Sequence, residues 1–302
     1  MKRRKFIQSA ALAVPAGIAG MPNLSGNLKE TSAPAFKMDY APHFGMFKNS
    51  AGEDLVDQLK FMADQGFRSL EDNGMLARPK EVQDKIGSTL TALGMRMGVF
   101  VIEGGDNWKI SLATGKKEFL DKFVATCKAS VELAKRVNAK WMTVVPGYFE
   151  RNLPLDIQTA NVIEAMRRGA EVLEPHGLTM VMEPLSDNPD LFLRHAAQTY
   201  LICKAVNSPA CKILYDIYHM QRNEGQLIPT IEKCWDEIAY FQIGDNPGRK
   251  EPNTGEINYK NIFKYIHGRG YTGVMGMEHG NAFPGKEGEM KLIQAYREVD
   301  IS

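Results

Sequence analysis

Eight short apolar runs alternate with longer segments of helical periodicity from Phe36 to the end of the chain. Within the longer segments, apolar residues recur every three or four positions, and a glycine often closes the segment, as in 80–94. Strands that are separated by helices usually pair in parallel, because each helix carries the chain back so that the next strand starts at the same edge of the sheet. The apolar runs span residues 36–44, 67–71, 95–103, 141–147, 178–185, 211–218, 238–245 and 273–280.

The number and length of these units favour a closed barrel. Eight strand-and-helix units over roughly 265 residues match the size of a (β/α)8 barrel. An open, doubly wound sheet is the alternative, but the GxGxxG motif that would follow its first strand is missing. We therefore predict an α/β fold, a (β/α)8 TIM barrel, over residues 36–302.

The N-terminal segment has the composition of an export signal. It begins MKRRKFIQSAALAVPAGIAG, with four basic residues ahead of an apolar, alanine-rich run that is too short to span a membrane. Arg3 and Arg4 resemble the pair of the twin-arginine signal, which implies a periplasmic protein. We predict that residues 1–35 are a signal peptide and linker; a disordered basic tail is the alternative.

The charge balance argues against a polyanionic partner. The chain carries 37 basic and 36 acidic residues, for a formal net charge of +1. It therefore has no global field to attract nucleic acid or an anionic membrane surface. We expect a small-molecule partner, no nucleic acid and no stable membrane anchoring, and leave a homo-oligomer open.

The four cysteines show no metal-site or redox pattern. They form no CxxC pair, and none lies near a histidine at metal-ligand spacing. Their apolar surroundings predict core packing, and a bridge between Cys203 and Cys211 or another pair stays open.

Each of the last four apolar runs carries, near its end, a side chain that could coordinate a cation. In a parallel barrel the carboxyl ends of the strands share one mouth, so these side chains become neighbours in space. Buried oxygen-bearing groups of this kind need a compensating charge, which a divalent cation supplies. Three carboxylates and one amide suit Mg²⁺ or Mn²⁺ better than zinc. The predicted ligands are Glu183, Asp216, Gln242 and Glu278.

A long polar loop, GDNPGRKEPNTGEINY, follows the seventh apolar run. Its glycines, prolines and asparagines exclude a helix or a central strand, and a long loop in a compact domain is usually functional or disordered. We predict that it forms a wall of the active site. Asp245 and Glu251 would hold the loop, Gly255 would allow its turn, and Arg249 would contact the substrate.

Three motifs in this region carry a resemblance to a known family. They are LYDIYHMQRNEG, FQIGDNPGRKEPNTGEINY and GYTGVMGMEHG, in that order. Together they resemble the hydroxypyruvate isomerase family of the xylose isomerase-like TIM barrels. The resemblance implies a metal held by the four predicted ligands, with Glu183 and Glu278 also acting as the acid/base pair.

The chemistry that the resemblance implies explains these residue types. Moving a carbonyl along a hydroxy-ketone requires removal of a proton beside the carbonyl and its return to the neighbouring carbon through an enediol. His219 could hydrogen-bond a substrate oxygen, although a structural histidine is the alternative. Arg249 is the candidate for gripping a substrate carboxylate. His43 and Glu71 are predicted to face the substrate from the early strands.

Three functions stay open from the sequence. The first is a metal-dependent isomerase of the hydroxypyruvate/tartronate semialdehyde type, or a ketose epimerase of the same superfamily. The second is a metal-dependent phosphoesterase like the endonuclease branch, which six histidines and a near-zero net charge disfavour. The third is a non-catalytic carbohydrate-binding barrel.

Overall fold

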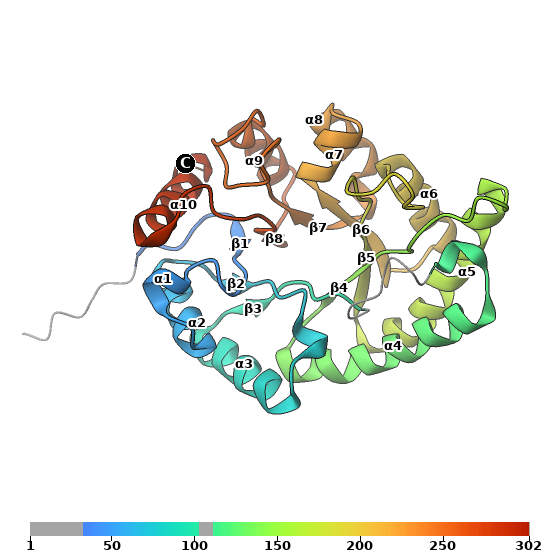
Figure 1. The fold of residues 1–302 in the computed structure, drawn as a ribbon, viewed down its shortest axis with the longest axis horizontal. Coiled ribbons are helices and arrows are strands. Elements are labelled where there is room, and N and C mark those ends of the chain that lie inside the picture. Colours follow the sequence, from blue (N-terminus) through green and yellow to red (C-terminus); the bar gives the residue numbers. More distant parts are fainter. Residues whose placement is uncertain (1–32, 103–110, 302) are drawn as a thin grey trace, which may run out of the picture. The chain divides into compact units, whose positions relative to one another are not determined.

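The computed structural model describes residues 33–102 and 111–301, so the predicted signal and linker, residues 1–35, lie almost entirely outside the described residues. The described chain forms the predicted α/β barrel, with its strands surrounded by helices (Figure 1). All the strand pairs are parallel. The strands are β1 (Asp39–Ala41), β2 (Ser69–Leu70), β3 (Arg96–Met97), β4 (Trp141–Val144), β5 (Thr179–Met182), β6 (Cys211–Asp216), β7 (Ile238–Gln242) and β8 (Val274–Gly276).

Helices connect successive strands and cover the outside of the barrel. They are α1 (Lys48–Ala51), α2 (Leu55–Asp64), α3 (Lys80–Leu93), α4 (Lys117–Val137), α5 (Leu155–Leu173), α6 (Ala196–Val206), α7 (Ile217–Asn223), α8 (Leu227–Cys234), α9 (Tyr259–Gly268) and α10 (Gly285–Val299). Short 3₁₀ turns add η1 (Met75–Ala77), η2 (Leu112–Thr114), η3 (Glu174–His176) and η4 (Trp235–Glu237).

Two sheets are joined into one ring by short bridges. The larger sheet has the order β1-β8-β7-β6-β5-β4, and the smaller one consists of β2 and β3. The isolated parallel bridge His43–Glu71 joins the segment after β1 to the segment after β2. The bridges Met97–Ala139 and Val101–Thr143 join β3 and the residues that follow it to the β4 segment. The β1, β2, β3 and β4 segments therefore follow one another around the ring, as the predicted barrel requires.

Several strands are shorter than the apolar runs that predicted them. The first run covers residues 36–44, but β1 ends at Ala41. The next residue is Pro42, which has no backbone N–H to extend the ladder, although its carbonyl accepts from the Glu71 amide at 2.9 Å. In the remainder of the run Pro42 is buried and His43 and Phe44 are half-buried, and this segment leads into the mouth of the barrel.

The core has two parts. The large cluster lies between the strands and the surrounding helices, and all four cysteines are buried, as predicted. A smaller cluster fills the barrel interior, with one residue from each of seven strand segments: Ala41, Val99, Trp141, Val181, Leu214, Tyr240 and Val274. Because side chains alternate along a strand, the residue two positions further on also points into the barrel. The interior cluster is therefore the floor of the mouth.

Among the described residues, no helix combines the length and the apolar character needed to cross a membrane.

Candidate active site

Three of the four predicted metal ligands stand one layer above the interior cluster. Asp216 and Gln242 are the last residues of β6 and β7 and are direct partners in the parallel ladder. Glu183 follows β5, and Glu278 follows β8 by two residues. Asp216, Gln242 and Glu183 each come two positions after a residue of the barrel floor. Those floor residues are Leu214, Tyr240 and Val181, respectively. Strand alternation thus turns these three side chains into the mouth.

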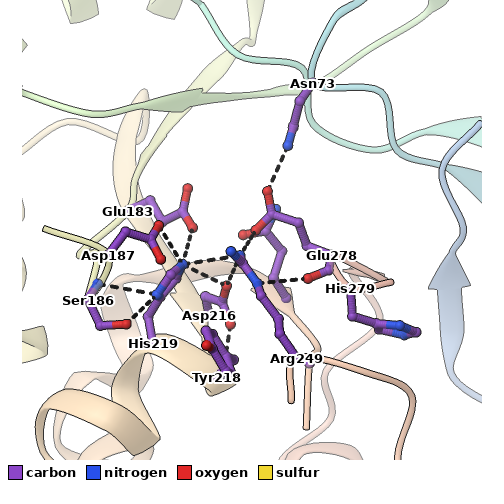
Figure 2. Close-up of polar contacts among 12 residues, drawn as sticks. Asn73, Glu183, Ser186, Asp187, Asp216, Tyr218, His219, Arg249, Glu278 and His279 are labelled. Carbon is purple, nitrogen blue, oxygen red and sulfur yellow. Dashed lines mark hydrogen bonds and ion pairs between the residues drawn. The ribbon is translucent and has the colours of Figure 1, made fainter. Parts of the chain in front are cut away.

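Four acidic and histidine side chains converge at this mouth (Figure 2). Glu183, Asp216, His219 and Glu278 each offer one ligand atom, and these atoms lie within 4.8 Å of one another. Asp216 and His219 are fully buried, and Glu183 is 5% exposed. Three carboxylates so close together repel one another unless a cation or protons compensate their charge.

Arg249 supplies part of that compensation. Its Nη2 atom lies 2.6 Å from Glu278 Oε2 and 3.2 Å from Asp216 Oδ2. Its Nε atom donates to the Glu278 backbone carbonyl at 3.1 Å, and the guanidinium lies over the Tyr218 ring. The side chain is 29% exposed, so it remains accessible from the mouth. The structure therefore places Arg249 beside the acidic residues, with both Glu278 and Asp216 in contact with its guanidinium.

The loop that carries Arg249 is held as the sequence predicts. Asp245 accepts hydrogen bonds from the backbone amides of Thr254, Gly255 and Ile257. Glu251 Oε2 accepts from the Ala282 amide at 2.8 Å, which ties the loop to the segment after β8. A Cβ on Gly255 would lie 2.0 Å from the Asn246 carbonyl, so only glycine fits that turn.

Burial makes the ionised forms of these acids unfavourable. Burial, followed by the charges of Glu278 and Asp216, raises the pKa of Glu183 well above its ordinary value. Burial also raises the pKa of Glu278 to about 7, against the opposing effect of Arg249. A divalent cation would reverse these shifts, because it favours ionised ligands.

The residues present fit such a cation. Among the described residues, Glu183 Oε1 and Gln242 Oε1 are buried and have no hydrogen-bond partner. A buried acceptor without a donor is unfavourable, and a metal ion satisfies it. Carboxylate and amide oxygens with one imidazole are donors that divalent cations accept. His219, predicted only as a substrate contact, thus lies within reach of the same centre.

His219 is held by the segment after Glu183. Its Nδ1 atom lies 2.8 Å from Ser186 Oγ and 3.2 Å from the Ser186 amide nitrogen. Its Nε2 atom faces the centre, 3.4 Å from Asp216 Oδ2 and 3.1 Å from Arg249 Nη2. Burial lowers the pKa of this imidazole, which favours the neutral ring. Because the Ser186 N–H donates to Nδ1, the proton of the neutral ring lies on Nε2, which can donate to an oxygen at the centre.

The two early-strand residues are engaged by the protein itself. The His43 ring nitrogens contact the backbone carbonyls of Phe44 and His279, at 2.9 and 3.1 Å. Glu71 is 2% exposed and accepts from Tyr240 and Gln242. Both residues line a cavity of about 310 Å³ beside Glu278. Both residues lie at the mouth, Glu71 with its two oxygens accepting from protein donors and His43 with its ring beside two backbone carbonyls.

Two functional candidates were missed by sequence reasoning. Asn73 Nδ2 donates to Glu278 Oε1 at 2.7 Å, and Ser186 fixes the His219 ring. Asn73 follows β2 in the segment EDNGM, and Ser186 follows Glu183 in EPLSDN. Both come after strand ends, so the positional criterion that selected the acids could have selected them too. Asn73 holds one oxygen of Glu278 and leaves the other to Arg249.

The comparison with known families agrees with this fold. Residues 59–298 match the family described as Xylose isomerase-like TIM barrel, and the chain belongs to that family. Hydroxypyruvate isomerase of Escherichia coli (strain K12) is 34% identical over 172 residues, which are 56% of this chain and 66% of that protein, just under two thirds of its length. 2-Oxo-tetronate isomerase of Cupriavidus necator is 26% identical over 247 residues, 80% of this chain and 92% of that protein.

A solved structure gives the same fold. It is described as an AP endonuclease of family 2 from Brucella melitensis, with a TM-score of 0.73, 25% sequence identity, and coverage of 83% of this chain and 96% of that one. The predicted barrel and family resemblance are thus confirmed. The named sequence relatives support an isomerase, the class of enzyme that the sequence predicts.

Proposed function

We propose that this isomerase interconverts a small 2-oxo acid carrying a hydroxyl group on the neighbouring carbon and the isomer in which the carbonyl and the hydroxyl have exchanged places, a hydroxy-aldehyde in the case of hydroxypyruvate, with a divalent metal ion at the barrel mouth. The observation that supports this most strongly is the convergence of Glu183, Asp216, His219 and Glu278 beside Arg249. The relatives named hydroxypyruvate isomerase and 2-oxo-tetronate isomerase point to the same substrate class. Mg²⁺ and Mn²⁺ are the preferred candidates for a mainly oxygen-donor site.

The carboxylates would carry the proton transfer. One of Glu183 and Glu278 takes the proton from the hydroxyl-bearing carbon, and a proton is delivered to the adjacent carbonyl carbon. The hydroxyl proton passes to the former carbonyl oxygen, so the substrate and product remain isomers. Asn73 and Arg249 hold the two oxygens of Glu278, which limits its rotation. When bound, a divalent cation supplies charge that stabilises the enediolate oxygens.

Two side chains would orient the substrate. His219 presents Nε2 to the centre and can hydrogen-bond a substrate oxygen. Arg249 can form a charge-assisted pair with the substrate carboxylate, for which its planar guanidinium is suited. The cavity of about 310 Å³ beside Glu278 could hold the remaining carbons of a longer substrate.

The phosphoesterase alternative finds less support in the site. The potential metal-binding group found among the described residues has a single histidine, His219. The formal net charge of +1 also offers no general attraction for a nucleic acid backbone.

A substrate screen tests the proposed function. Metal-stripped protein would be mixed with hydroxypyruvate, 2-oxo-tetronate, ketoses and aldoses, with and without Mn²⁺ or Mg²⁺, and followed by proton NMR. We expect isomerisation of at least one hydroxylated 2-oxo acid, and only after metal is restored. Turnover of ketoses alone would favour the epimerase alternative, and binding without turnover would favour a carbohydrate-binding barrel.

Arg249→Ala is expected to lower kcat/KM for a 2-oxo acid by roughly 10- to 150-fold, because a hydrogen bond to a charged group contributes about 1.5 to 3 kcal/mol. Arg249→Lys should restore little, since lysine lacks the planar fork. Steady-state kinetics on the accepted acid measures both effects. Arg222→Ala is the matched control, because Arg222 also lies over the Tyr218 ring but does not contact Glu278. If Arg249→Ala stays within twofold of the wild type, Arg249 has no role in substrate binding.

A further inference from the structure

A buried polar chain of Glu71, Tyr240 and Gln242 links the segment after β2 to β7 inside the barrel. Glu71 reaches in from the β2 side and accepts the Tyr240 hydroxyl at 2.9 Å through Oε2. Its other oxygen, Oε1, accepts from Gln242 Nε2 at 2.8 Å. Tyr240 and Gln242 are fully buried, and Glu71 is 2% exposed. Both oxygens of this carboxyl group are therefore engaged by side chains of β7.

Two glycines make the room for this chain. A Cβ on Gly276 would lie 1.7 Å from Glu71 Oε2, and a Cβ on Gly98 would lie 2.4 Å from the Tyr240 hydroxyl oxygen. Neither glycine has a positive φ, so close approach, and not backbone conformation, requires a residue without a side chain. Gly276 of β8 pairs with Gln242 of β7 in the sheet. Because Gly276 has no side chain, the Glu71 carboxyl group can occupy the space beside Gln242.

The hydrogen bond to Glu71 decides which end of the Gln242 amide faces the centre. Tyr240 and Gln242 both donate to Glu71, so the carboxyl group is paired with the NH₂ group of the amide. The Gln242 oxygen is then turned away from Glu71, and it is the buried oxygen that has no partner among the described residues. Gln242 pairs in register with Asp216, so this oxygen belongs to the same level of the mouth.

We propose that Glu71 is a positioning residue that holds the Gln242 amide with its oxygen available as a metal ligand, and that it does not bind substrate. This inference rests on the proposed metal-dependent function and replaces the substrate-binding role predicted for Glu71. A partner that orients a ligand side chain typically changes metal affinity 10- to 100-fold. Gly276 and Gly98 contribute indirectly, because they allow Glu71 and Tyr240 to meet.

The test is calorimetric titration of Mn²⁺ into metal-stripped protein. Glu71→Gln should weaken Mn²⁺ binding by about 10- to 100-fold, because a glutamine can donate as well as accept and no longer selects the NH₂ end of Gln242. At saturating Mn²⁺, KM for the accepted substrate should stay within about twofold of the wild type. Tyr240→Phe, which removes one donor to Glu71, should weaken Mn²⁺ binding in the same direction by a smaller factor.

Glu289→Gln is the matched control. Glu289 is also fully buried and accepts hydrogen bonds on both oxygens, from Asn49 and Ser50, but it lies on α10. Its replacement should leave Mn²⁺ affinity unchanged.

The outcomes separate the inference from the proposed function. If the wild type binds no Mn²⁺ or Mg²⁺, the metal-dependent function is wrong and the role of Glu71 is lost with it. If the wild type binds Mn²⁺ and both Glu71→Gln and Tyr240→Phe bind it equally well, the positioning role alone is wrong. A raised KM at saturating Mn²⁺ with unchanged Mn²⁺ affinity would return Glu71 to the substrate site. If Glu71→Gln fails to fold, Tyr240→Phe decides the question by its Mn²⁺ affinity.

Discussion

Replacing either Glu183 or Glu278 by glutamine is expected to lower kcat at least about 100-fold, the low end of what general acid/base catalysis contributes. Glutamine keeps an oxygen that can face a cation and nearly the same volume, but it cannot accept a proton as a base. Both carboxyl groups lie at the centre, and burial raises the pKa of each. Steady-state kinetics at saturating metal, with metal binding measured in parallel, separates loss of proton transfer from loss of the metal.

The control is Glu237→Gln. Glu237 is 6% exposed and paired with Lys212, so it is a buried acid of comparable environment, but it precedes β7 at the opposite end of that strand from Gln242. Its variant should keep kcat within about threefold of the wild type, since it removes no group from the site. If a glutamine variant of Glu183 or Glu278 keeps wild-type kcat with its metal bound, that residue is not a catalytic acid or base.

Asp216→Ala is expected to weaken divalent-metal binding by more than about 100-fold, beyond the range seen for changes that only orient a ligand. Asp216 is fully buried, and its Oδ2 atom lies among the ligand atoms of the centre. Its removal also leaves Arg249 with one carboxylate partner fewer. Calorimetric titration of Mn²⁺ at pH 8 measures the change directly.

Asp216→Asn provides the comparison that separates charge from folding. Asp216 Oδ1 accepts from the Tyr218 amide at 2.8 Å and caps α7, and asparagine can keep that cap. The asparagine variant should therefore fold as the wild type does but still bind Mn²⁺ more weakly. An Mn²⁺ affinity equal to that of the wild type in Asp216→Ala would show that this residue is not a ligand.

For the wild type, the affinity for Mn²⁺ should fall as the pH drops below about 7, the pKa of Glu278, because the metal must then displace a proton.

The barrel was predictable because its signal repeats along the whole chain. Each apolar run from 36–44 to 273–280 contains or overlaps one observed strand. The limits of the strands were less predictable, since β2 and β3 pair over two residues each and the ring closes there by isolated bridges. The helices α7 and α8 also lacked a clear periodic pattern, because they span only seven and eight residues and α7 begins directly after Asp216, the last residue of β6.

The site was predictable where position along a strand decides it. Glu183, Asp216, Gln242 and Glu278 all occupy strand ends, and parallel strands bring such ends together. The contact of Arg249 with Glu278 and Asp216 could not be derived, because it depends on the path of a long loop. The role of Glu71 depends on a contact across the barrel to Gln242, and on a glycine at 276 whose purpose is visible only when the strands are assembled.

The most direct test of the account is turnover of an accepted 2-oxo acid by the wild-type, metal-loaded protein in D₂O, followed by NMR. Proton transfer by Glu183 and Glu278 through an enediolate predicts deuterium on the carbon that receives the proton, with incorporation that requires the metal. Product without carbon-bound deuterium, together with Glu→Gln variants whose kcat falls only as far as their metal occupancy, would indicate a hydride shift and contradict the acid/base roles.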